Sequence, residues 1–262
     1  MGKFFDEIPE FIIPWIKEQK MFWVATAPLA PDGLVNVSPK GYEGTFHIAN
    51  SKQVWYEDMT GSGVETIAHV GENGRITVLF TAFDGPPRIC RIFGKGTVYE
   101  RDTPEYNALL PPEERQPGSR SIIMVDIHKV GTSCGYSIPF YKFDGHRMKL
   151  RADLAQKQNT DVMAEEEAWS SQAEEIAIPI PEKGLRRYWR DNNEKSLDGI
   201  PGLRYAPNSR ARFLYVDPKT IYQDRPSRSA TRWISSQTVA AFTLGAVASA
   251  ALVRVLHQQR FL

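Results

Sequence analysis

The chain has 262 residues, 42% of them hydrophobic, so it can form one or two domains with a buried core and is not a disordered protein. Its 32 Lys and Arg residues are balanced by 31 Asp and Glu residues, which excludes the concentrated positive charge typical of nucleic-acid-binding proteins. Two cysteines and five histidines, none with the spacing of metal ligands, favour a reducing compartment and argue against a metal cofactor.

The first predicted element is a short helix. Apolar residues recur at spacings of three and four between residues 8 and 19, which places them on one face of a helix. Pro14 lies inside this segment, where a proline kinks or splits a helix. Residues 1–20 carry acidic side chains and no long apolar run, so we expect no signal peptide.

A series of strands follows from residue 21. Runs of β-branched and aromatic residues are separated by turn residues such as Pro31-Asp32-Gly33, which predicts antiparallel strands. One helix of about two turns is inserted at residues 62–71, where Gly71 is the expected stop. Six strands with short turns and one inserted helix predict a mainly β domain with helices, closed or nearly closed into an antiparallel barrel.

Beyond residue 150 the composition changes. Three consecutive glutamates at 165–167 and a basic cluster at 186–190 are typical of solvated helices and loops. We therefore divide the chain into a barrel domain at residues 1–150, a helical and irregular extension that packs on it at 151–224, and a basic linker with a terminal apolar helix at 225–262.

The terminal run at residues 239–253 carries no charge, and extending it back to Ile234 gives twenty residues. That length is close to what a bilayer requires, and arginines flank the run on both sides. We expect a single membrane-spanning tail anchor that leaves the barrel facing the cytosol. The alternative is a packing helix of a cytoplasmic protein.

Two segments of the predicted barrel carry the chemistry. Ser38-Pro39-Lys40-Gly41 ends a strand with a hydroxyl, a rigid backbone angle, a cation and a hinge. About twenty residues later, a glycine-rich turn at 60–66 precedes the predicted helix, where backbone N–H groups and the hydroxyls of Ser62 and Thr66 favour an anion. Together they fit a phosphorylated cofactor, whereas the turn taken alone is also explained as a simple helix cap.

The order and spacing of five segments resemble a known family. They are FWVATA (22–27), VNVSPKG (35–41), TGSGVETIAH (60–69), GRITVLF (74–80) and PRICRIFG (87–94). These segments are similar to the pyridoxamine-5′-phosphate-oxidase-like, FMN-binding split-barrel family, over about residues 8–150. The resemblance implies a six-stranded antiparallel split β-barrel that binds FMN, and a homodimer with the flavin at the subunit interface.

The resemblance also implies which residues hold the cofactor. In such barrels one strand lies along the isoalloxazine ring, the turn into the helix holds the ribityl phosphate, and a basic residue of a later strand neutralises that phosphate. The matching positions are Asn36, Val37, Ser38, Pro39 and Lys40 on the strand, Ser62, Gly63 and Thr66 at the turn, and Arg91, with Arg88 as the alternative, on the later strand.

The chain departs from the oxidases that act on pyridoxamine phosphate. Their Arg-Lys pair inside the phosphate helix is Glu65-Thr66 here, and their Tyr-x3-Arg-x3-Ser and C-terminal Arg-x-His substrate motifs are missing. Lys40 does match a substrate-contacting lysine of those oxidases, although an ordinary surface lysine is the alternative interpretation. We therefore expect the cofactor of the family with a different substrate.

The predicted function is an FMN-dependent oxidoreductase with an unidentified small-molecule substrate. No residue stands out as a general acid or base, which suits a flavoprotein because the flavin carries the electrons. Three alternatives stay open: a non-catalytic module that binds or sequesters flavin, pyridoxamine 5′-phosphate oxidase itself, and a barrel that takes deazaflavin or haem.

Overall fold

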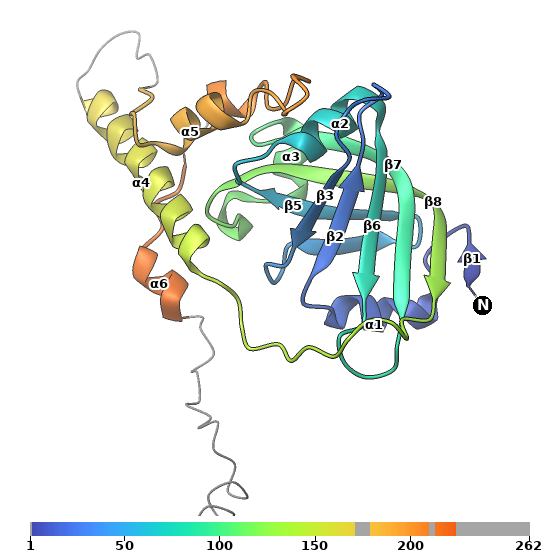
Figure 1. Ribbon diagram of the computed structural model, residues 1–262. Helices are drawn as coiled ribbons and strands as arrows, with labels where there is room; N and C mark the ends of the chain where they lie inside the picture. The colour runs from blue at the N-terminus through green and yellow to red at the C-terminus, as the bar shows by residue number, and fades with distance from the viewer. Residues whose placement is uncertain (1, 171–178, 210–212, 224–262) are drawn as a thin grey trace, which may run out of the picture. The chain divides into compact units, whose positions relative to one another are not determined.

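The computed structural model describes residues 2–170, 179–209 and 213–223, drawn in colour in Figure 1. Its strands form one antiparallel sheet, and helices lie at the ends of the strands and in the C-terminal extension. The strands are β1 (Lys3–Phe5), β2 (Phe22–Thr26), β3 (Asn36–Lys40), β4 (Phe46–Asn50), β5 (Gln53–Met59), β6 (Arg75–Thr81), β7 (Ile89–Glu100) and β8 (Ser119–Ser133). The α-helices are α1 (Ile13–Glu18), α2 (Glu65–Asn73), α3 (Pro104–Leu109), α4 (Lys149–Ser170), α5 (Leu185–Asn192) and α6 (Pro218–Gln223).

The sheet has eight strands and is not closed, so the predicted number of six is wrong. Its order is β3-β2-β6-β7-β8-β5-β4, and β1 pairs with β8 through Phe4 and Gly131. A strand as short as β1 has no periodicity of its own, because it exists only through its pairing with a partner distant in sequence. That partner, β8, spans 15 residues and ends at Ser133.

Two helices were predicted within the barrel region, and both are present with shifted ends. Helix α2 spans Glu65–Asn73, and its C-cap is Gly74, which has φ 74° and is therefore the stop in place of Gly71. The first predicted helix is a short 3-10 turn followed by α1, with Pro14 in the first turn of α1, where proline costs least. Figure 1 shows α1 and α2 at opposite ends of the strands.

The C-terminal extension shares its buried core with the barrel. Leu185, Trp189 and Leu203 belong to the same apolar cluster as the inward side chains of β2, β6 and β8. Trp189 is fully buried, and its indole N–H donates to the hydroxyl of Thr60 at 2.8 Å. The burial of these large apolar side chains, together with the Trp189 hydrogen bond, fixes the extension against the end of β5.

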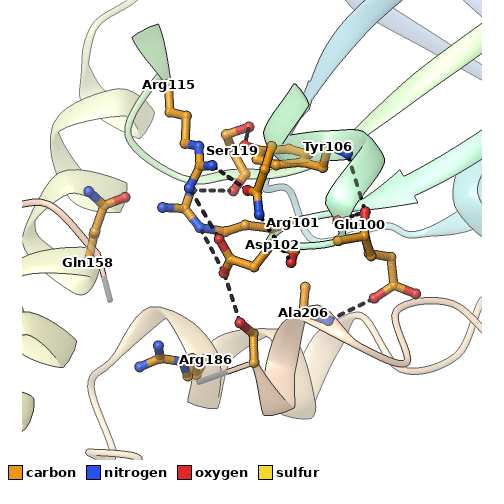
Figure 2. Close-up of polar contacts among 12 residues, drawn as sticks. Glu100, Arg101, Asp102, Tyr106, Arg115, Ser119, Gln158, Arg186 and Ala206 are labelled. Carbon is orange, nitrogen blue, oxygen red and sulfur yellow. Dashed lines mark hydrogen bonds and ion pairs between the residues drawn. The ribbon is translucent and has the colours of Figure 1, made fainter. Parts of the chain in front are cut away.

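Polar contacts also join the extension to the barrel (Figure 2). Asp102, at φ 70°, accepts from Arg115 at 3.1 Å and from the Ser209 hydroxyl at 2.9 Å. The carboxylate of Glu100 accepts the backbone N–H groups of residues 204–206, including Ala206 at 2.8 Å. These contacts hold the chain after α5 along the end of β7.

Asp161, on α4, caps the start of α5 and gives the extension a pH dependence. Its Oδ2 accepts the backbone N–H groups of Leu185 at 2.8 Å and Arg186 at 3.0 Å. Burial raises the pKa of Asp161 to about 6, outweighing those hydrogen bonds and the charge of Arg186. A folded pKa above the ordinary value of about 4 means that stability from this group is present at low pH and is lost as the pH rises from about 4 to about 6.

We therefore expect the Asp161→Asn variant to gain in relative stability as the pH rises. The difference in unfolding free energy between variant and wild type should increase by about 2–3 kcal/mol from pH 4 to pH 7, because asparagine accepts the same N–H groups without carrying a buried charge. Urea unfolding at several pH values measures this difference. Asp153→Asn, on the exposed face of the same helix, is the control. A difference that does not change with pH would contradict the role of Asp161.

Within the described residues, no helix is long and apolar enough to cross a membrane. The predicted tail anchor at residues 234–253 lies outside the described residues, as does the rest of the predicted segment 225–262.

Candidate functional site

A cavity of about 230 Å³ lies between β3, the end of β5 and the start of α2. We call it the small cavity. Six of the nine sequence-predicted cofactor residues line it together. Its lining residues are Ser38, Pro39, Lys40, Met59, Gly61, Ser62, Gly63, Glu65, Thr66 and Arg120. The structure thus brings the predicted strand and the predicted glycine-rich turn into one place.

Strand β3 is the edge strand that forms one wall of the small cavity. Among the strands that the structure describes, it pairs with β2 alone, and Pro39 stands opposite Trp23. An edge position tolerates a proline, which has no N–H to donate to a further strand. Because side chains alternate along a strand, Ser38 and Lys40 point to one face, whereas Val37, 60% exposed, points to the other.

A buried carboxylate pairs with two cationic residues that line the small cavity. Asp58 on β5 is fully buried, and its two oxygens accept from Lys40 at 2.9 Å and from Arg120 at 2.8 Å. Burial acts to raise the pKa of Asp58, but Arg120 and Lys40 outweigh it and hold this pKa below its ordinary value. Asp58 is therefore ionised at neutral pH, and the three groups together carry one net positive charge.

Asn36 does not line the small cavity, but it organises two residues that do. Its amide donates to the hydroxyl of Thr66 at 3.0 Å, and its side-chain oxygen accepts from the hydroxyl of Ser38 at 3.1 Å. The same amide reaches Thr26 at 3.3 Å, whose hydroxyl contacts Nδ1 of the buried His69 at 3.1 Å. A single amide thus sets the orientation of hydroxyls on both walls of the cavity.

Arg91 and Val37 lie on the face of the sheet away from the small cavity. Arg91 stands opposite Leu79 in β6 and Gly131 in β8, and it donates to the Ser133 hydroxyl at 3.4 Å. Its sequence neighbours in β7 are fully buried on the inner face. Within one chain the structure therefore does not bring Arg91 together with the glycine-rich turn. The alternative residue, Arg88, lies over the Trp15 ring at 5.5 Å.

A larger cavity of about 920 Å³ shares Pro39 and Lys40 with the small one. Aromatic side chains from separate segments contribute to its lining, among them Phe83 and Tyr141, whose rings meet edge to face at 5.5 Å. A volume of this size is in the range of ligand pockets, and aromatic walls suit a planar ring. Lys40 thus stands between a small polar cavity and a large aromatic one.

Comparison with known proteins places this chain in a family. A family model described as pyridoxamine 5′-phosphate oxidase matches residues 8–134. The pyridoxamine 5′-phosphate oxidase family protein ustO of Aspergillus flavus is 34% identical over 218 residues, which cover 82% of this chain and 83% of that protein. The chain belongs to the pyridoxamine 5′-phosphate oxidase family. The 218 aligned residues are more than the family segment at 8–134 contains, so the likeness to ustO includes residues outside that segment.

Solved structures of bacterial proteins are also similar to this member of the pyridoxamine 5′-phosphate oxidase family. A HupZ variant of Group A Streptococcus aligns with a TM-score of 0.39 at 18% identity, covering 48% of this chain and 99% of that chain. A protein related to general stress protein 26 from Clostridium acetobutylicum, described as of the pyridoxinephosphate oxidase family, aligns with a TM-score of 0.34 at 13% identity, covering 48% and 89%.

The sequence of this family member did not reveal the charged residues beneath its cavity. Asp58 and its neighbour Glu57 are consecutive acids in an otherwise apolar strand, which was a usable signal of a buried polar site. Arg120 precedes the apolar run of β8, and its neighbours in the sequence do not indicate a buried cation. Asn193 reaches the site from the extension at 3.0 Å from Arg120, and no pattern in the sequence indicates that.

Proposed function

We propose that this protein is an FMN-dependent oxidoreductase that holds the phosphate of FMN in the small cavity. The observation that carries the proposal is the meeting of Lys40 and Arg120 with the hydroxyls of Ser38, Ser62 and Thr66 around one cavity. A phosphate monoester is a dianion with several acceptor oxygens, so cations and hydroxyl donors are the groups that bind it. Membership of the pyridoxamine 5′-phosphate oxidase family supports a flavin over other cofactors.

The two cavities fit a phosphorylated flavin in size. The small cavity, at about 230 Å³, has room for a phosphate and part of a chain, and the adjoining 920 Å³ cavity has room for a ring. Gly61 has open space where a side chain would stand, with no atom within 4 Å of an added Cβ. At Gly61 the turn therefore offers its backbone to a ligand, whereas the Glu65 carboxylate lies beside Gly63.

In this proposal the chain's own residues bind and orient the cofactor, which supplies a ring that accepts and returns electrons. Lys40 and Arg120 attract the phosphate, and Asp58 fixes both cations in place. Asn36 holds the Ser38 and Thr66 hydroxyls so that both walls are set before a ligand arrives. Such preorganisation lowers the entropy that binding costs.

We propose a substrate other than pyridoxamine 5′-phosphate. Glu65, at the first position of α2, lines the small cavity where the oxidases of this phosphate have a cation. The motifs with which those oxidases bind the phosphate of their substrate are missing from this chain, whereas the aromatic walls of the larger cavity favour an uncharged or aromatic molecule. The redox chemistry is then that of the family with a different substrate.

We also propose a homodimer with the flavin at the subunit interface. Supporting this, the outer side of the edge strand region exposes Leu34, Val35 and Val37, at 53%, 72% and 60%. A contiguous apolar stretch on a free edge is typical of a surface that another chain covers. Arg91 faces outward in the same row as Pro39, so it serves a flavin only across such an interface. The mass of the purified protein in solution tests this assembly.

Membrane attachment through residues 234–253 remains a proposal based on the sequence. Deleting residues 234–262 should convert a protein that sediments with membranes into one that does not. A full-length protein that stays in solution without detergent would contradict the anchor.

The spectrum of the purified protein is the first test of the function. We expect flavin absorbance bands, either as isolated or after addition of FMN, and reduction of the bound flavin by NADH or NADPH in stopped flow. A colourless protein that ignores added FMN would refute the proposal. A flavin that neither nucleotide reduces would favour the non-catalytic flavin-binding module instead.

Glu65 gives a sharper prediction for the phosphate. We expect Glu65→Gln to tighten FMN binding by about threefold to tenfold, because it removes a like charge from the cavity and keeps the size of the side chain. Flavin fluorescence titration measures the dissociation constant. Glu72→Gln, near the other end of α2, is the control and should leave the constant unchanged. Unchanged or weaker FMN binding by Glu65→Gln would place the phosphate elsewhere.

A further inference from the structure

A residue outside the barrel contacts two residues that line the small cavity. Asn193, which ends α5, is fully buried and extends its side chain to the glycine-rich turn and to β8. Its Nδ2 donates to the carbonyl of Gly61 at 3.0 Å, and its Oδ1 accepts from Arg120 at 3.0 Å. The side-chain amide of Asn193 thus links the glycine-rich turn to Arg120, the cation on the other side of the cavity.

Arg120 depends on this contact for its position. Its Nε donates to Asp58 at 2.8 Å, and its Nη1 donates both to the Gly63 carbonyl at 2.9 Å and to Asn193. A guanidinium is a rigid fork, so fixing two of its nitrogens fixes its plane. Asn193 therefore acts on the orientation of a cavity cation, and through Gly61 on the turn that follows β5.

The loop after Asn193 holds the residue firmly in this place. The backbone carbonyl of Asn193 accepts from Leu203 at 2.8 Å, and its N–H donates to Trp189 at 2.7 Å. At Gly202 an added Cβ would lie 2.5 Å from the Asn193 carbonyl and 2.7 Å from Val64, so only glycine allows the loop to approach the start of α2 this closely. The backbone and the side chain of Asn193 are thus both fixed.

The same loop touches the other residues around the cavity. The backbone N–H of Leu197 donates to Glu65 at 3.4 Å, and Asp198 accepts the backbone N–H of Leu34, just before β3, at 3.1 Å. Asp198 also lies 3.7 Å from Nε2 of the buried His69. Residues 193–203 therefore contact the turn, the helix start and the approach to the edge strand from one side.

We propose that Asn193 is a positioning residue of the small cavity, which sets Arg120 and the glycine-rich turn for the phosphate of the flavin. This inference rests on the proposed function and adds to it that the extension, outside the family segment at residues 8–134, completes the cofactor site. Asn193 makes no contact with the phosphate in this role. It acts through the Gly61 carbonyl and the Arg120 guanidinium.

The test compares FMN with riboflavin, which lacks the phosphate. In the wild type we expect FMN to bind more tightly than riboflavin. In Asn193→Ala the dissociation constant for FMN should rise about tenfold while that for riboflavin stays within twofold, because only the phosphate depends on Arg120 and the turn. Asn192→Ala, the exposed neighbour on α5, is the matched control and should keep the wild-type ratio.

The outcomes separate this inference from the function on which it rests. A wild type that binds neither flavin refutes the proposed function and the inference together. A wild type that prefers FMN, with an Asn193→Ala variant that keeps the preference, overturns the inference alone. If Asn193→Ala loses affinity for FMN and riboflavin to the same extent and also has a lower unfolding midpoint, the role of Asn193 is merely structural. That result also overturns the inference. If Asn193→Ala does not fold, Asn193→Ser, which keeps one polar group but cannot span both partners, gives the same readout.

Discussion

Replacing Asp58 with alanine should destabilise the protein by about 4 kcal/mol and lower its melting temperature by roughly 10 °C. Asp58 is fully buried and is the common partner of Lys40 and Arg120. Removing it leaves two cations at a buried place without a counter-charge, which costs far more than the loss of a surface ion pair. Thermal and urea unfolding of the variant at pH 7 measure the effect.

The cost of this substitution should depend on pH in a defined direction. The pKa of Asp58 is held below its ordinary value in the folded protein, so the stability that it contributes is present above the unfolded value of about 4 and is lost as the pH falls below it. We therefore expect the difference between Asp58→Ala and wild type to shrink at acid pH. Asp191→Ala removes an exposed ion pair with Arg187 on α5 and should leave the unfolding free energy essentially unchanged. Equal effects of the two substitutions would contradict the buried charge network.

Replacing Lys40 with methionine should weaken FMN binding by about tenfold to a hundredfold. A charge-assisted hydrogen bond to a phosphate contributes about 1.5–3 kcal/mol, which corresponds to that range. Methionine keeps the length and much of the apolar volume of lysine, and Arg120 still pairs with Asp58, so the fold should survive. Fluorescence titration with FMN and riboflavin measures the change and assigns it to the phosphate.

A lysine elsewhere on the sheet provides the control for Lys40. Lys129 on β8 is half-exposed and lies 4.0 Å from Asp6, far along the sheet from β3. Lys129→Met should bind FMN like the wild type. If Lys40→Met also binds FMN like the wild type, the phosphate does not lie in the small cavity, and the placement of the cofactor must be revised.

The sequence predicted the barrel and most of the lining of its cavity because both depend on local patterns. Alternating and β-branched runs gave the strands, and the turn at Gly61 to Gly63 carries its own chemistry in consecutive residues. The residues that charge and position the cavity were beyond such reasoning. Arg120 lies 62 residues after Asp58, and Asn193 lies 73 residues after Arg120. Only the packing of β5, β8 and the end of α5 brings the three residues together.

The number of strands and the face of Arg91 show the same limit. Strand β1 exists only because β8 is long enough to pair with it, and the length of β8 is set by its register with β7. Alternation in β7 places Arg91 on the same side as Ile89 and Phe93, but only the folded sheet shows that this side faces away from the small cavity. Periodicity identifies the two faces of a strand without saying which one meets the site.

The position of β3 at the free edge of the sheet has a kinetic consequence. An edge strand is held by one neighbour, so its amide hydrogens exchange with solvent through small local openings instead of global unfolding. A ligand seated against Ser38 and Lys40 would have to leave before that edge opens. Amide exchange along Asn36–Lys40 should therefore slow when the site is filled, and the strand would act as a built-in reporter of occupancy, readable by mass spectrometry even for a ligand without colour.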